Sequence, residues 1–476
     1  MYTPLLNYYK QAPLSKLNQW IIPCISLELL ILGYASACDK LLLLGFGIIA
    51  LFGIGLITVH PEIGVILCIG IQFSRITEAI TFFADIRGIY RFLLLFTFYA
   101  GAIKLFLKDY YLISFRNRLF YLSLLFFTLI FFSNLYASNT QYSLQHTVYY
   151  FKAWMLLLAT VLFLRSWNGI LYTLLFSLIL NTIGNSYLIY SYVTNPAGIA
   201  TLVLKGNLLR AKGFIFDPNF AALSSIVIAP LVIPFLKRTS SKILKIILLA
   251  CLAISGLSVI LTFSRMGIVT LTALGAYILF KEKHNKWVWL AVTACCILVI
   301  LFVPSVFFYR IENLLSGKLD LSSIKRLLLL RGGTQMFLDH PILGVGTGNF
   351  LFLSPNYAPG VVREYYAHNL YLEAAAEWCI VGFVILLLMI WKVLTYLWKI
   401  QKVCYETNKG LYYTTYAIEL SFVGFLIGSL FLSTLPLPYF WGFVGLIIVI
   451  QTLLKKGELQ LQNQYESSKT AIQSRL

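Results

Sequence analysis

The stretch CIVGFVILLLMIWKVL, residues 379–394, carries a single charged side chain, Lys392, in an otherwise apolar run. An apolar helix needs about 20 residues to cross the hydrocarbon core of a bilayer, so this run and its continuation predict a membrane-spanning helix. Similar runs recur along the chain without the alternating pattern of a barrel strand. Because backbone amides cannot stay unpaired in hydrocarbon, the spans are predicted to be helices.

The overall composition agrees with this interpretation. Hydrophobic residues make up 59% of the chain and charged residues 12%, against about 45–50% and about 25% in soluble domains. We therefore expect an all-α polytopic membrane protein. A net charge of +19 would suggest a nucleic-acid partner in a soluble protein, but here the basic residues cluster in short segments between apolar runs. They are read as signals of membrane topology, with no nucleic-acid partner.

The apolar runs predict about 12–14 spans. They lie near residues 19–37, 41–59, 62–80, 90–107, 118–136, 147–165, 169–190, 219–236, 243–263, 266–280, 287–304, 379–398, 413–433 and 438–454. Two runs are the least secure: 62–80 carries Arg75 and Glu78, and 266–280 is short.

Charge bias between the spans predicts the orientation. The segments KRTSSKILK, KEKHNK and KIQKVCYETNK are rich in Lys, whereas the alternate connections YASNTQ and TLPLPY have no Lys or Arg. The positive-inside rule then places both termini in the cytoplasm. The expected organisation is a cytoplasmic tail 1–18, spans over 19–304 with an outer loop near 191–218, a large periplasmic loop 305–370, spans over 371–454 and a cytoplasmic tail 455–476.

Polar motifs gather at the predicted outer ends of the spans. In RAKGFIFDPNFAAL, Arg210 precedes Asp217, Pro218 and Asn219. Asp followed by Pro is also a common helix start, and that structural interpretation weighs about as much as a functional one. In LTFSRMGIVTL, Arg265 lies between two apolar runs, where a functional role is favoured over simple snorkelling to the interface.

A third motif, IKRLLLLRGGTQMFLDHPILGVGTGNF, contains Arg326, Arg331 and His340. His340 precedes a proline and is expected to end a helix. The Gly-x-Gly-x-Gly of this motif, from Gly344 to Gly348, follows no strand, so a nucleotide-binding loop is not indicated and a flexible turn is the favoured interpretation.

The fourth motif, REYYAHNLYLEAAAEW, ends at the apolar run quoted above. His368 stands beside Asn369, and Glu373 and Glu377 follow at four-residue spacing on the helix that begins there. Asn369 is a good helix cap and the tyrosines suit a membrane interface. Capping explains every residue of this motif except the histidine.

In this order, the four motifs resemble those of the O-antigen ligase and O-antigen polymerase superfamily of bacterial polysaccharide-assembling membrane glycosyltransferases. The resemblance covers residues from about 205 to 445. It implies a GT-C-like enzyme of the inner membrane that inverts the sugar, needs no metal and no other cofactor, and works at the periplasmic face. The implied donor is a glycan linked to undecaprenyl diphosphate, and the implied acceptor is a lipid A core or a second lipid-linked glycan, with polysaccharide-assembly proteins as further partners.

The resemblance also implies roles for individual residues. His368 corresponds to the proposed catalytic base, and the arginines that would hold the diphosphate correspond to Arg210, Arg265 and Arg326, with Arg331 as a further candidate. Supporting roles fall to Asp217, Asn219, Asn369 and Glu373.

General chemistry is consistent with these roles. Arginine binds phosphate oxygens with two parallel donors, and a histidine of ordinary pKa near 6.5 can accept the proton of a sugar hydroxyl. The sequence has no Asp-x-Asp pair to hold a divalent cation, and its eight cysteines have no CxxC spacing.

Two other classes stay open. A transporter or channel, of the kind that bicarbonate-transport names imply for some relatives, could use Arg75, Glu78, Lys152 and Arg265 along a pathway. An inactive scaffold of an envelope complex is the other alternative. Ligase and polymerase are not distinguished by the sequence.

Overall fold

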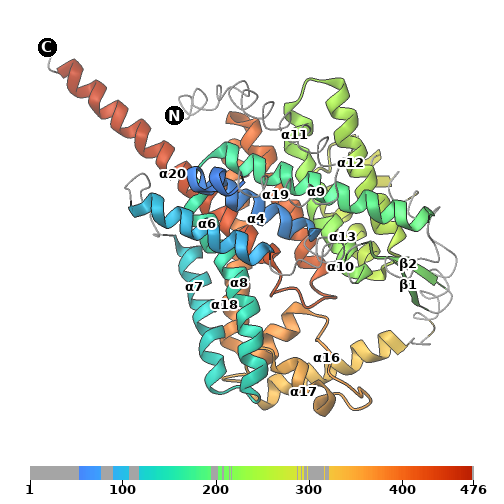
Figure 1. The fold of residues 1–476 in the computed structure, drawn as a ribbon. Coiled ribbons are helices and arrows are strands. Elements are labelled where there is room, and N and C mark those ends of the chain that lie inside the picture. The colour runs from blue at the N-terminus through green and yellow to red at the C-terminus, as the bar shows by residue number, and fades with distance from the viewer. Residues whose placement is uncertain are drawn as a thin grey trace, which may run out of the picture.

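The computed structural model describes residues 53–76, 89–106, 117–194, 202–205, 208–213, 215, 217–286, 288–290, 292–293, 297, 316 and 321–473. This part of the chain is almost entirely helical (Figure 1). The α-helices are α4 (Pro61–Ser74), α6 (Ile89–Phe106), α7 (Arg118–Phe132), α8 (Thr140–Phe163), α9 (Trp167–Thr194), α10 (Pro218–Ile228), α11 (Ile233–Arg238), α12 (Lys242–Leu261), α13 (Arg265–Lys281), α16 (Leu321–Asp339), α17 (Asn349–Tyr357), α18 (Leu370–Thr407), α19 (Lys409–Gly428) and α20 (Pro438–Gln473). The short 3-10 helices η1 (Ser133–Leu135) and η2 (Ala229–Val232) extend α7 and join α10 to α11.

Eight candidate membrane spans occur within the described residues, judged by helix length and hydropathy. They are α7 with η1, α8, α9, the continuous segment Pro218–Arg238, α12, α18, α19 and the first part of α20. The prediction of an all-α polytopic membrane protein is confirmed. The predicted runs 19–37, 41–59 and 287–304 lie wholly or largely outside the described residues.

α18 shows how closely the apolar pattern predicted the helices. Its 38 residues consist of two helical parts that meet at Cys379, where φ is 59° and ψ is −161°. The predicted span began at this kink. The part before it, Leu370–Trp378, is the helix expected to start after His368 and Asn369.

The helices pack around a continuous apolar core. α18 packs against α7 and α19, α20 packs against α8, and α4 packs against α9. Large aromatic side chains from distant parts of the sequence fill the core, among them Phe126, Trp378 and Trp441, which are at most 1% exposed. Packing of this kind fixes the positions of α8 and α18, which carry much of the site described below.

α16 and α17 form a small layer at one end of the bundle (Figure 1). α16 and α17 pack against each other and against the start of α18. They enclose a second, smaller apolar cluster that includes Leu329, Met336 and Phe350. The connection between α11 and α12, with Arg238 and Lys242, lies at the opposite end of the bundle (Figure 1).

Two local features differ from the expectations. The run 62–80 was predicted to be helical throughout, but α4 ends at Ser74 because Arg75 adopts a left-handed conformation with φ of 56°. Glu78 lies outside the described residues. In the expected outer loop 191–218, strands β1 (Leu202–Lys205) and β2 (Leu208–Ala211) form an antiparallel hairpin that pairs Val203 with Arg210. The strands are too short to show an alternating pattern, so they were not predicted from the sequence.

Candidate active site

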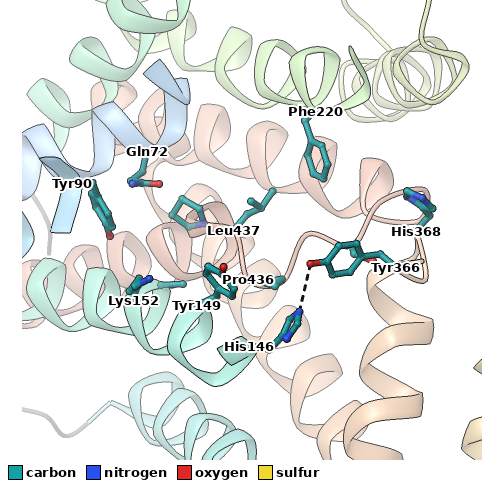
Figure 2. Close-up of a pocket in the computed structure, with 13 residues that line it drawn as sticks. Gln72, Tyr90, His146, Tyr149, Lys152, Phe220, Tyr366, His368, Pro436 and Leu437 are labelled. Carbon is teal, nitrogen blue, oxygen red and sulfur yellow. Dashed lines mark hydrogen bonds between the residues drawn. The ribbon is translucent and has the colours of Figure 1, made fainter. Parts of the chain in front are cut away.

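A cavity with apolar walls and a few polar side chains opens between the helices (Figure 2). Its volume is about 400 Å³. It is lined by residues from α4, α6, α8 and α10, from the segment before α18, from the segment that joins α19 to α20, and from the first residue of α20. These are Gln72, Tyr90, His146, Tyr149, Lys152, Ala153, Phe220, Tyr366, His368, Ser433, Pro436, Leu437 and Pro438. A cavity of this size with a few polar groups on apolar walls is typical of a small-molecule site.

His368 lies at the edge of this cavity, immediately before α18 (Figure 2). Its backbone is left-handed, with φ of 50°. The Asn369 side chain caps α18 by accepting hydrogen bonds from the backbone N–H groups of Tyr371 and Leu372, at 3.0 and 3.1 Å. The Leu370 N–H donates to the Ser429 carbonyl at 2.9 Å. The predicted cap is confirmed, and it fixes the histidine where α18 meets the cavity.

Two of the predicted residues, Arg210 and Asn219, meet at the start of α10. Arg210, 8% exposed, donates from Nε to the Thr262 carbonyl at 2.9 Å and from Nη2 to Asn219 Oδ1 at 3.1 Å. The Ser264 hydroxyl donates to the same Asn219 oxygen at 2.7 Å. Asn219 therefore joins the hairpin to the segment that carries Arg265.

Asp217 has the structural role that its sequence context suggested. Its carboxylate accepts a hydrogen bond from the Asn219 backbone N–H at 2.7 Å and caps α10, with Pro218 at the first helical position. The cap also holds Asn219 in place beside Arg210.

Arg265 extends this cluster toward α16. It is the first residue of α13, which Ser264 caps by accepting from the Gly267 N–H at 3.1 Å. Arg265 Nη1 donates to the Ser323 hydroxyl on α16 at 3.3 Å. Arg326 follows Ser323 by three residues, about one helical turn, and is half-buried.

Arg331 is placed differently from the other arginines. It lies five residues beyond Arg326 on α16 and is exposed. That spacing turns its side chain by about 140° from the direction of Arg326. The two arginines of α16 therefore point to different sides of the helix.

The arginine cluster adjoins the cavity through Phe220. This residue follows Asn219 and lines the cavity. The Arg75 guanidinium lies over the Phe220 ring, 4.8 Å from its centroid. Positive charge is therefore present beside the wall of the cavity that α10 forms.

The two glutamates near the start of α18 are buried, with Glu373 6% and Glu377 1% exposed. Glu377 Oε1 accepts a hydrogen bond from the Phe350 backbone N–H at 3.3 Å. This contact attaches the start of α17 to α18. Glu377 thus has a structural partner, and Glu373 lies one turn nearer to His368.

His146 was not predicted as a site residue from the sequence. This imidazole lines the cavity from α8, and the Tyr366 hydroxyl lies 3.5 Å from its Nε2 (Figure 2). Tyr149 and Lys152 line the same cavity from α8. His146, Tyr149 and Lys152 are spaced by three residues, which places them near one side of a helix. In the sequence, the sign of this site was that these three polar residues recur every three positions along a largely apolar run.

His340 ends α16 as expected, since its N–H donates to the Met336 carbonyl at 3.1 Å, and its side chain is exposed. The Gly-x-Gly-x-Gly that follows makes the expected turn, with φ of 74°, 90° and 72° at Gly344, Gly346 and Gly348. All three glycines are buried. Within the described residues, no group of three or more His, Cys, Asp or Glu side chains is placed to hold a metal ion.

Fold and site together define a polytopic membrane protein with a cavity that two histidines line, beside a cluster of arginines. Residues 247–387 match the model of the O-antigen ligase family, and the resemblance to the O-antigen ligase and polymerase superfamily is thereby confirmed for that stretch. The match supports a membrane enzyme of this type. It includes Arg265, Arg326 and His368, whereas Arg210 and Asn219 precede it. A comparison with curated proteins gives no match.

Proposed function

We propose that the protein transfers a glycan from an undecaprenyl-diphosphate donor to a hydroxyl acceptor at the periplasmic face of the bacterial inner membrane. The transfer inverts the anomeric centre and needs no metal ion. One observation supports the proposal. The first turn of α10 lines the cavity of His368 through Phe220, and the neighbouring Asn219 of that turn accepts hydrogen bonds from Arg210 and Ser264. A base and a cationic cluster are therefore within reach of one substrate.

The arginine cluster is the proposed site of the diphosphate. Arg210 and Arg265 come from segments that Asn219 and Ser264 join, and Arg265 contacts the helix that carries Arg326. Guanidinium groups held this way can offer paired donors to phosphate oxygens and stabilise the charge of the leaving diphosphate. Arg331, on another side of α16, would add only long-range positive charge.

His368 is the proposed general base. A membrane-anchored donor holds its diphosphate near the headgroups, so a residue at the end of a spanning helix can lie level with the first sugar. The imidazole would accept the proton of the acceptor hydroxyl as that oxygen attacks the sugar from the face opposite the diphosphate. Asn369 and Asp217 would act as positioning residues through the caps of α18 and α10, and Glu373 would support His368 from one turn away.

The partners follow from this reaction. The acceptor is a lipid A core if the enzyme is a ligase, or a second lipid-linked glycan if it is a polymerase. Both reactions use the same donor and the same cavity. Polysaccharide-assembly proteins are proposed as further partners in the membrane.

The test is turnover of a glycan linked to undecaprenyl diphosphate by the purified full-length protein in proteoliposomes, with each acceptor in turn and with a chelator present. We expect release of undecaprenyl diphosphate with one of the two acceptors and no effect of the chelator. Activity lost on chelation and restored by magnesium or manganese would contradict the metal-independent mechanism. Solute flux without turnover of either acceptor would favour the transporter instead.

A further inference from the structure

His146 is a buried imidazole whose hydrogen bonds define its protonation pattern. It is 8% exposed, and its Nδ1 lies 2.9 Å from the Tyr142 carbonyl oxygen of the preceding turn of α8. A carbonyl oxygen can only accept, so Nδ1 carries the hydrogen. In the neutral ring, Nε2 is then left with a lone pair.

The Nε2 atom of His146 faces the Tyr366 hydroxyl at 3.5 Å. With Nδ1 protonated, Nε2 is the acceptor and Tyr366 is the donor. Partial desolvation of this side chain, which is 43% exposed, followed by the nearby charge of Glu373, raises the pKa of Tyr366, so the phenol keeps its hydrogen. Tyr366 extends from the segment before α18 and lies between His146 and His368 (Figure 2).

Aromatic contacts fix the orientation of the His146 ring. Tyr142 stacks on it with centroids 6.3 Å apart, and Tyr149 and Tyr366 meet it edge-on at 5.9 and 6.2 Å. Such contacts hold the ring even when the cavity is empty of substrate. The position of Nε2 is therefore set before substrate binds.

The turn formed by Gly344, Gly346 and Gly348 also packs against the imidazole of His146 through Gly348. Gly348 has φ of 72°, and a Cβ atom on it would lie 2.4 Å from Cγ of His146. The turn itself is anchored, because Thr347 and Ser133 share a hydrogen bond of 2.6 Å and Asn349 Oδ1 accepts from the Asn139 N–H at 2.6 Å. The glycine motif therefore has a role in the site: it lets the loop backbone approach the imidazole closely.

We propose that His146 is a positioning residue of the active site: it accepts the hydrogen of Tyr366, so that the Tyr366 oxygen presents its lone pairs to the cavity and binds the hydroxyl of the acceptor sugar. His146 does not take the proton of the reaction, because Tyr366 occupies its lone pair; that proton passes to His368. The inference rests on the proposed glycan transfer and adds the residues that orient the acceptor.

The experiment measures kcat and the KM for the acceptor in the proteoliposome assay, with whichever of the two acceptors is turned over. His146→Phe and Tyr366→Phe should each raise the KM for the acceptor by about tenfold, the effect of losing one hydrogen bond. The double variant should be no worse than either single variant, since both changes break one chain of hydrogen bonds. His146→Gln, which retains an acceptor atom, should recover most of the affinity.

His340→Phe is the matched control, because His340 is exposed at the end of α16 and should leave both constants unchanged. Tyr366→Phe removes one hydroxyl and no packing, so it tests the idea even if His146→Phe folds poorly. An unchanged KM in Tyr366→Phe, or independent losses that multiply in the double variant, would overturn the inference. A wild-type chain without glycan transfer would instead remove the proposed function, and the inference with it.

Discussion

At the scale of single residues, His368 has the most unusual backbone of the proposed site. Its φ of 50° lies in the left-handed region, which residues other than glycine rarely enter. The two hydrogen bonds to Asn369 and the bond from Leu370 to Ser429 fix the residues that follow it. Strained conformations held by their surroundings are often found at functional sites. The backbone therefore agrees with the proposed role of the side chain.

We expect His368→Ala to reduce glycan transfer by roughly 10²–10⁴-fold, the usual contribution of a positioned acid-base group. Expression and donor binding should be retained, because the side chain lies at the edge of the cavity and not in the core. The measurement is the initial rate of product formation, with His340→Ala as the control. Near wild-type transfer in His368→Ala, together with an inactive His340→Ala, would show that the base has been misassigned.

Arg265→Lys should impair transfer although it keeps the positive charge. A lysine has no planar fork and loses the geometry that joins Arg265 to Ser323 on α16. We expect transfer to fall by about 10- to 100-fold, as for the loss of a hydrogen bond to a charged group. Arg118→Lys, at the exposed first residue of α7, is the matched control. Equal activity of the two variants would mean that Arg265 acts only through its charge.

At the scale of elements, the start of α18 positions the catalytic segment. Asn369 satisfies two backbone N–H groups that the helix would otherwise leave unpaired. We expect Asn369→Ala to destabilise the protein by about 1 kcal/mol and Asn369→Ser to be nearly neutral, because serine also caps helices well. Thermal unfolding in detergent, compared between the two variants, measures the difference. If both variants unfold at the wild-type temperature, the cap contributes nothing to stability.

At the scale of the whole molecule, the two ends of the helical bundle differ in the elements that they carry. Lys237 and Arg238 at the end of α11 and Lys242 at the start of α12 lie at one end, whereas α16 and α17 lie at the opposite end (Figure 1). Applied to short connections, the positive-inside rule predicts that the end where α11 meets α12 lies in the cytoplasm. The proposed site would then face the periplasm.

Single cysteines test this orientation in a background without the eight native cysteines. Val362→Cys, at a side chain that is 96% exposed before α18, should react with an impermeant maleimide in intact spheroplasts. Ser240→Cys, exposed between α11 and α12, should react only after permeabilisation. The reverse labelling pattern would place the site in the cytoplasm and invert the topology.

The sequence by itself determined the class of the protein and most of its helices. Long apolar runs can satisfy their backbone amides in a bilayer only as helices, so hydropathy alone predicted α7, α8, α9, α12, α19 and α20. The caps at Asp217 and Asn369 and the helix end at His340 were also predictable, because capping depends on residues a few positions apart. The motifs also indicated the family resemblance that the match over residues 247–387 confirms.

The tertiary structure alone decided which of these residues meet. Asn219 joins Arg210 to Ser264 across gaps of 9 and 45 residues, and Tyr366 meets His146 across 220 residues. Such contacts depend on how the helices pack, and neither hydropathy nor local spacing carries that information. His146 was missed for this reason: only the packing of α8 beside the segment before α18 makes it part of the same cavity as His368.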